Sequence, residues 1–281
     1  MPMTSNRTSA APPAPVPAAP PLTVFLYSHT HWDREWYLSR NQFQYRLIRT
    51  VDEIVEIIEA DNSFETFVLD GQTSIIDDYL EIRPERCGKL AELIRAGKLV
   101  IGPWYTMPDI FLPDGESLIR NFLFGHRDCA RWDAPFPNVG YVPDSFGHIE
   151  QLPQLLRGAG IDNFLFSRGL PVEFENRPCF KREFLWRAPN GDAVLAIHLP
   201  GAYLNAMFLL SPAERDGEAL RERIQAMIDQ FRPASHAPDL VLGAHGIDHC
   251  WLQRDIPEIL DALPKLFPDV RFRHGSLQDY L

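Results

Sequence analysis

The segment "LTVFLYSHTHWDREWY" (22–37) joins an apolar run to a dense group of polar and aromatic side chains. The apolar part, residues 22–27, has the length and composition of a buried strand. Residues 28–37 then hold two histidines, two acidic residues, an arginine and two tryptophans. So many reactive side chains at the end of a buried strand predict a functional site there, and the rest of the chain must say which kind.

The overall composition excludes several classes of partner. The chain has 281 residues, 45% of them hydrophobic, and a formal net charge of -11. Such an acidic chain lacks the basic surface that a nucleic-acid backbone or an anionic membrane attracts. It also contains no apolar run of about 18 residues, the length that a membrane-spanning helix needs. We therefore predict neither nucleic acid nor a membrane as a partner.

The first 21 residues differ in composition from the rest. Residues 1–21 are mostly Ala, Pro, Ser and Thr, so they cannot bury enough apolar surface to fold, and their prolines interrupt any signal-peptide core. The four cysteines are far apart and form no CxxC pair, which favours a reducing compartment. We predict a cytoplasmic protein with a disordered tail over 1–21 and one folded catalytic domain over 22–281.

Strands and helices alternate through the folded region. Hydrophobic patterning predicts strands over 22–27, 65–70, 98–102, 138–143, 163–167, 239–245 and 270–274. Helices are predicted over 45–60, 74–82, 85–96, 115–132, 151–160, 217–231 and 256–267. Residues 182–199 predict a hairpin that turns at Asn190-Gly191. This order predicts an α/β fold with a parallel sheet covered by helices, either an incomplete barrel or a doubly wound sheet.

Polar clusters follow nearly every predicted strand. They read "SHTHWD", "DGQ", "PWYTMPD", "PDSFGH", "SRG" and "HGIDH", in chain order. In parallel α/β folds, ligands bind at the carboxyl ends of the strands. In the first cluster, His31 and Asp33 are two residues apart and face the same way while the chain stays extended. Imidazole and carboxylate suit Zn²⁺ or a similar divalent ion, although the same pattern also fits a solvated, hydrogen-bonded loop.

Two later clusters add carboxylates. Asp144 in "PDSFGH" fits a third metal ligand, a nucleophile or a helix N-cap. Asp248 lies beside His249 in "HGIDH". Aromatic residues near the same edge, such as Trp36, offer flat faces on which sugar C–H groups pack, or they are ordinary rim packing. Carboxylates together with aromatic rings favour a carbohydrate ligand.

These motifs together resemble glycoside hydrolase family 38, the α-mannosidases, in their bacterial form. The matching stretches are "HTHWDREWY", "IGPWYTMPD" with "GESLIRN", "YVPDSFGH" followed by "QLPQLL", and "GIDH". They occur in the family's order and cover residues 22–281. The resemblance implies an irregular seven-stranded parallel β/α barrel with one Zn²⁺ ion, acting as a retaining α-mannosidase on oligosaccharides or glycoconjugates.

The resemblance also implies roles for individual residues. His31 and Asp33 would bind zinc, and Asp144 would be both a zinc ligand and the catalytic nucleophile. Asp248 would be the general acid and base. Three further residues would line the substrate site: Trp36, which would stack on the mannose ring, with Phe146 and Arg168. A retaining glycosidase needs two such carboxyl groups, one nucleophilic and one protonated.

The family's fourth zinc ligand is the main departure. It is a histidine in a later HDS or HDA motif, and no such motif occurs before Leu281. We therefore expect a truncated homologue or half of a split enzyme, with a downstream domain or partner chain completing the site. Three histidines, His245, His249 and His274, are the candidates within this chain. Two alternatives remain open, a non-catalytic carbohydrate- or metal-binding remnant and a metal hydrolase of the polysaccharide-deacetylase type.

Overall fold

A computed structural model describes residues 21–61, 64–249 and 253–281. The predicted disordered tail, apart from Pro21, lies outside the described residues. Within the described ranges the strands are β1 Thr23–Thr30, β2 Phe67–Leu69, β3 Leu99–Val100, β4 Tyr141–Val142, β5 Asn163–Phe166, β6 Glu183–Arg187, β7 Ala193–His198, β8 Leu240–His245 and β9 Arg271–His274. Each predicted strand is present, so the predicted order of strands along the chain is confirmed.

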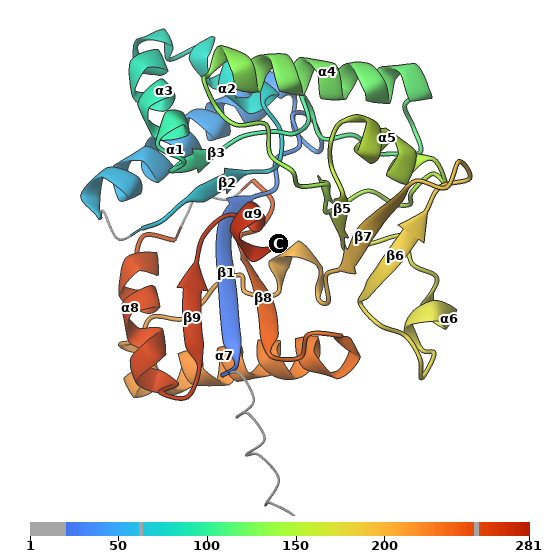
Figure 1. Cartoon of the computed structure of the whole chain (residues 1–281). Helices are drawn as coiled ribbons and strands as arrows, with labels where there is room; N and C mark the ends of the chain where they lie inside the picture. Colours follow the sequence, from blue (N-terminus) through green and yellow to red (C-terminus); the bar gives the residue numbers. More distant parts are fainter. Residues whose placement is uncertain (1–20, 62–63, 250–252) are drawn as a thin grey trace, which may run out of the picture.

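Helices separate most of these strands. They are α1 Arg40–Ala60, α2 Ser74–Leu80, α3 Cys87–Arg95, α4 Gly115–Arg131, α5 Leu152–Gly158, α6 Val172–Glu175, α7 Glu218–Phe231, α8 Ile256–Leu266 and α9 Leu277–Tyr280. Short 3-10 helices lie at Pro84–Arg86, Ala202–Leu204, Glu214–Gly217 and Arg232–Ala234. Figure 1 shows α7 and α8 around β1, β8 and β9, and α4 and α5 on the other side of the molecule near β5.

The strands form two sheets. The first has the order β3-β2-β1-β8, and β9 also pairs with β1. All its pairings are parallel. The strand β1 can pair with three strands because β9 lies along its first half and β2 along its end, on the edge opposite β8. The second sheet has the order β4-β5-β7-β6. Its β6–β7 pair is the antiparallel hairpin expected around Asn190-Gly191, and Gly191 has the positive φ of 94° that such a turn requires.

The irregular seven-stranded parallel β/α barrel is not confirmed. The described strands form two open sheets that no ladder joins, and β6 runs antiparallel. The strands β3 and β4, which would meet at one junction between the sheets, are only two residues long, and each pairs with one strand. The general prediction of an α/β fold with parallel strands and covering helices is confirmed.

The strand β1 is buried on both faces, which explains its uninterrupted apolar sequence. Val24, Phe25, Leu26 and Tyr27 are all buried, as expected for a central parallel strand covered on two sides. The Tyr27 hydroxyl lies 3.4 Å from the hydroxyl of Tyr141 on β4. Side chains therefore connect the two sheets in the interior, where no strand pairing does.

The helix α4 packs closely against the loop after β3. Trp104 stacks on Phe122 with ring centroids 3.8 Å apart, and Gly125 faces the same loop. A Cβ atom on Gly125 would lie 2.0 Å from the backbone oxygen of Pro103. An added methyl group cannot fit there unless the helix moves away from the loop.

We expect Gly125→Ala to destabilise the protein by about 2–3 kcal/mol, because overpacking against backbone forces the helix to shift. This corresponds to a fall in melting temperature of roughly 4–12 °C. Gly88→Ala is the matched control, since nothing lies within 4 Å of a Cβ at that helical glycine. Thermal melts of both variants test the packing. Equal melting temperatures would contradict it.

Candidate active site

The predicted site residues lie where several strands end. His31 follows β1 directly, Asp144 and Arg168 each lie two residues beyond β4 and β5, and Asp248 lies three residues beyond β8. The two sheets meet here, because His31 belongs to the first sheet and Asp144 follows a strand of the second. His31 Nε2 lies 3.8 Å from Asp144 Oδ2. The carboxyl ends of the strands therefore converge as predicted.

His31 lies at the centre of this cluster and is held by its backbone and its ring. Its backbone pairs with the segment after β8 through His31–Asp248 bridge contacts. Its Nδ1 lies 3.1 Å from Oδ1 of Asp70. Its Nε2 is buried without a hydrogen-bond partner and lies 3.5 Å from Oδ1 of Asp33. Burial alone would lower the pKa of His31, but Asp70 and Asp33 raise that pKa well above its ordinary value.

Asp33 has a second histidine beside it. His249 Nε2 lies 3.1 Å from Oδ2 of Asp33 and 3.1 Å from its backbone nitrogen. Burial would raise the pKa of Asp33, but the adjacent rings of His249 and His31 lower it well below its ordinary value. Asp33 is therefore ionised at neutral pH. Of the three histidines considered as replacement ligands, His249 lies next to a predicted ligand.

The other two histidines belong to a separate buried network. Ser28 Oγ lies 3.1 Å from His245 Nδ1 and 3.0 Å from His274 Nε2. Burial lowers the pKa of His245 to about 4 and that of His274 to about 3, so both rings are neutral at neutral pH. Both of these rings contact Ser28, on the side of β1 away from the contacts that Asp33 and Asp144 make with His31 and His249.

Asp144 has a cation on one side and His31 on the other. The Arg168 guanidinium lies 3.0 Å from Oδ1 of Asp144 and 5.2 Å from the ring centre of Phe146. Burial raises the pKa of Asp144, while the charges of His31 and Arg168 oppose that increase. A nucleophilic carboxylate must be ionised, so these two cations favour the reactive form.

Tyr203 was not predicted from sequence and lies between the two proposed catalytic carboxyl groups. Its hydroxyl donates to Oδ1 of Asp248 over 2.8 Å and lies near enough to Asp144 to lower the pKa of that carboxyl. Burial and the charges of Asp248 and Asp144 raise the pKa of Tyr203, so its hydroxyl remains a donor at neutral pH. Tyr203 follows β7 in "HLPGAYLN", a stretch with no charged side chain to mark it.

The predicted substrate-lining rings are exposed. Trp36 is 70% exposed and Phe146 is 62% exposed. The Phe146 ring lies against the Arg168 guanidinium, which in turn contacts Asp144. Within the described part of the chain, no ring contact or ion pair joins Trp36 to the other predicted residues. The exposed face of Phe146 is therefore available beside the carboxylate cluster to a ligand with apolar C–H groups.

A metal site was predicted at His31, Asp33 and Asp144. Among residues 21–61, 64–249 and 253–281, no three His, Cys, Asp or Glu side chains form a metal-binding group as they stand. The donor types nevertheless fit Zn²⁺, because one imidazole and two carboxylates converge. The buried Nε2 of His31 also lacks a hydrogen-bond partner and faces both carboxylates. The residues present are therefore compatible with a zinc ion in chemistry and burial.

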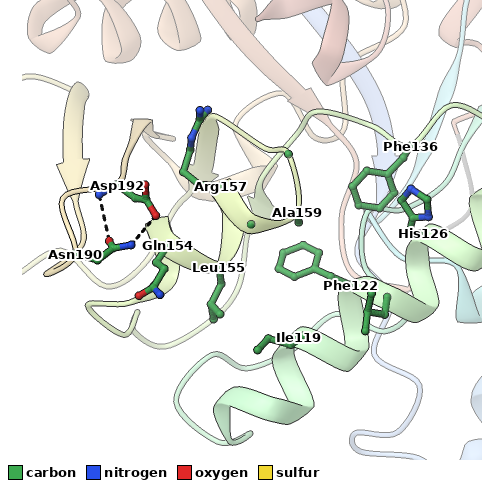
Figure 2. Close-up of a pocket in the computed structure, with 13 residues that line it drawn as sticks. Ile119, Phe122, His126, Phe136, Gln154, Leu155, Arg157, Ala159, Asn190 and Asp192 are labelled. Carbon is green, nitrogen blue, oxygen red and sulfur yellow. Dashed lines mark hydrogen bonds between the residues drawn. The ribbon is translucent and has the colours of Figure 1, made fainter.

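A groove lies away from this cluster. It has a volume of about 890 Å³ and lies between α4, α5 and the turn of the β6–β7 hairpin. Figure 2 shows its apolar walls, which include Phe122 and Phe136, and the hydrogen bonds between Asn190 and Asp192 at one end. None of the predicted site residues lines it.

Comparison with known proteins identifies the family. A family model described as the N-terminal domain of family 38 glycosyl hydrolases matches residues 21–280. The chain belongs to glycoside hydrolase family 38. The resemblance inferred from "HTHWDREWY" and "YVPDSFGH" is thereby confirmed, and the carboxylate cluster is the candidate active site of a family 38 domain.

Relatives of this family 38 domain match it in sequence and structure. A putative mannosylglycerate hydrolase from Halalkalibacterium halodurans is 38% identical over 266 residues, which is 92% of this chain and 29% of the relative. The crystal structure of an α-mannosidase from Enterococcus faecalis V583 has a TM-score of 0.84 and 35% identity over 92% of this chain and 28% of that one. The chain thus spans less than a third of these relatives.

The family 38 domain also shares its fold with a polysaccharide deacetylase. The structure of a putative polysaccharide deacetylase from Mycobacterium smegmatis has a TM-score of 0.55 at 14% identity, covering 96% of this chain. At that identity the likeness is one of fold alone, whereas the family match extends over residues 21–280. In the part of the chain that the structure describes, no helix is long and apolar enough to cross a membrane.

Proposed function

We propose that this domain hydrolyses α-mannosidic bonds with retention of configuration and with a Zn²⁺ ion at the active site. The observation that carries the proposal is the convergence of Asp33 and Asp144 on the buried, unpaired Nε2 of His31, at 3.5 and 3.8 Å. Membership of family 38 supports glycoside hydrolysis, and several relatives are named α-mannosidases. His31, Asp33 and Asp144 would hold the ion.

The chain's own residues can supply the two steps of a retaining reaction. Asp144 attacks the anomeric carbon, and Asp248 donates a proton to the departing oxygen. In the second step, Asp248 takes a proton from the water that releases the sugar from Asp144. Tyr203 donates to Asp248 and keeps that carboxyl group in place. When bound, zinc would hold sugar hydroxyl groups and help to distort the ring.

The substrate is an α-mannoside, and the relatives suggest which kinds to test first. One relative is described as a putative mannosylglycerate hydrolase, which suggests a mannose joined to a small acid. Others are named α-mannosidases, which suggests α-mannosides in general. We propose oligosaccharides or glycoconjugates as the natural substrates. Trp36 and Phe146 would pack against the sugar, since both rings are exposed and Phe146 lies against Arg168, which contacts Asp144.

A fourth zinc ligand is part of the proposal. The relatives are much longer than the region matched here. This chain spans 29% of the length of one relative and 28% of another. We propose that a histidine from a further domain or a partner chain completes the site. Without it, the three ligands of this chain still match the number that catalytic zinc sites use.

We expect the chain to release the aryl alcohol from an aryl α-mannoside, with a higher rate after zinc is added to metal-stripped protein. The measurement is the absorbance of released nitrophenol with and without zinc. Binding of mannoside without turnover would favour the non-catalytic remnant instead. Release of acetate from acetylated glycans, with no turnover of the mannoside, would favour a deacetylase.

A further inference from the structure

A buried carboxylate behind His31 has no role in the catalytic scheme above. Asp70 follows β2 and has no exposed surface. Its Oδ1 lies 3.1 Å from His31 Nδ1, and its Oδ2 accepts from the Trp32 backbone N–H at 2.8 Å and from the Gln72 side-chain amide at 2.9 Å. A carboxylate can accept all three N–H groups, because it has acceptor sites on both oxygens.

The backbone at Asp70 is in a conformation that most residues avoid, although aspartate adopts it more readily than most. Its φ is 48°, in the left-handed region, where most side chains are strained. Such strain persists only where the surroundings impose it, and it concentrates at functional sites. The turn that Asp70 makes places its carboxylate directly behind the His31 ring.

The contact decides which ring nitrogen of His31 is available. A carboxylate beside Nδ1 keeps the proton on that nitrogen, so the lone pair of the neutral ring is on Nε2. Nε2 is the buried atom that faces Asp33 and Asp144. Because the His31 backbone is already fixed by its bridge to the segment after β8, ring orientation is the remaining freedom. Asp70 removes it.

We propose that Asp70 is the positioning residue of this site, fixing the orientation and tautomer of His31 so that Nε2 faces the metal position. Carboxylates commonly do this behind metal-binding histidines. The inference rests on the proposed zinc function. It goes beyond it by assigning metal affinity to a residue that touches neither the metal position nor the substrate.

Asparagine at position 70 would keep the shape but cannot satisfy the same contacts. If its amide oxygen faces His31, its NH₂ group meets the Trp32 and Gln72 donors. If its oxygen faces those two donors, its NH₂ group meets His31 Nδ1 and drives the proton to Nε2. Reversing the Gln72 amide does not help, because its Oε1 accepts from the Met107 backbone N–H at 3.2 Å. Either arrangement weakens metal binding.

The test is calorimetric titration of metal-stripped protein with zinc alone. We expect Asp70→Asn to weaken zinc binding by about 10–100-fold relative to the unmodified chain. Asp52→Asn is the matched control, because Asp52 is a partly buried carboxylate that accepts from Tyr79 and Arg83 instead. It should bind zinc like the unmodified chain. Circular dichroism and melting temperature establish that each variant is folded.

The outcomes separate this inference from the proposed function. Equal zinc affinity in folded Asp70→Asn and the unmodified chain overturns the role of Asp70 and leaves the zinc site intact. Absence of zinc binding by the folded, unmodified chain overturns the zinc site, and the inference fails with it.

If Asp70→Asn does not fold, the unmodified chain alone provides the test. Protein with ¹⁵N-labelled histidine is loaded with ¹¹³Cd²⁺, and metal–nitrogen coupling is measured by NMR. We expect coupling to His31 Nε2 and a proton retained on Nδ1. Coupling to Nδ1, or loss of the Nδ1 proton, would overturn the inference.

Discussion

Asp144→Asn is expected to reduce turnover of an aryl α-mannoside by roughly 10⁴-fold or more while leaving the fold intact. The carboxylate is the proposed nucleophile, and an amide oxygen cannot form the covalent intermediate at a comparable rate. The substitution preserves the shape of the side chain. It removes the negative charge that faces His31 and the Arg168 guanidinium, 3.0 Å away.

We do not expect Asp144→Asn to lower the stability of the folded protein. Burial raises the pKa of Asp144, so the native protein holds the proton of this carboxyl group more tightly than the unfolded chain does. A group of this kind contributes stability that declines as the pH rises from the unfolded towards the folded pKa. At neutral pH its ionised form is therefore a cost, which asparagine removes. We expect an unchanged or higher melting temperature.

A neighbouring carboxylate provides the control for Asp144→Asn. Asp109 accepts from the Ser145 hydroxyl at 3.1 Å, so Asp109→Asn perturbs the same loop without removing the proposed nucleophile. We expect less than about a tenfold loss of kcat/KM for this variant. Retention of most activity in folded Asp144→Asn would remove the nucleophile assignment. Equal losses in both variants would indicate a structural effect of the loop.

Local patterns were sufficient for the order of strands and helices, but the end of β1 was missed. The predicted strand stops at residue 27, whereas β1 extends to Thr30. Ser28, His29 and Thr30 are polar, and this polarity suggests a loop. The parallel ladder nevertheless continues through them, because His29 pairs with Val68 and Ser28 with His245. Pairing with distant strands decides this boundary, and a single sequence does not contain that information.

The closure of the sheet was beyond sequence patterning for a related reason. Residues 98–102 and 138–143 each predict a full strand, but the paired parts are only Leu99–Val100 and Tyr141–Val142. Apolar residues in these segments are buried by side-chain packing as well as by sheet pairing. Hydrophobicity reports burial in either case, so it cannot distinguish an open pair of sheets from a barrel.

Some residues of the candidate site were predictable from the sequence and others were not. His31 and Asp33 were predictable because their spacing places both side chains on one side of an extended chain. Asp70 and Tyr203 have no such spacing partner, and they reach the site only when β2 and the segment after β7 pack beside β1. The sequence marked Asp70 only as part of a polar cluster after a strand. Its role depends on contacts with residues 31 and 32, almost 40 positions away.

The proposed general acid can be separated from a structural aspartate by the choice of leaving group. A nitrophenolate leaves readily without a proton, whereas a sugar or glycerate oxygen needs one. Asp248 accepts a hydrogen bond from Tyr203 at 2.8 Å, so its loss also leaves a buried hydroxyl without this partner. The structural effect is the same for every substrate, but the effect on proton donation is not.

We therefore expect Asp248→Ala to slow hydrolysis of an unactivated mannoside by about 10²–10⁴-fold, and that of a nitrophenyl mannoside by less than about tenfold. Tyr203→Phe is the comparison, because it breaks the same hydrogen bond and keeps the Asp248 carboxyl group. It should affect both substrates to a similar, smaller extent. The measurement is kcat/KM for each enzyme on both mannosides. If Asp248→Ala lowers the two values equally, with a reduced melting temperature, Asp248 is a structural partner of Tyr203 and another residue must donate the proton.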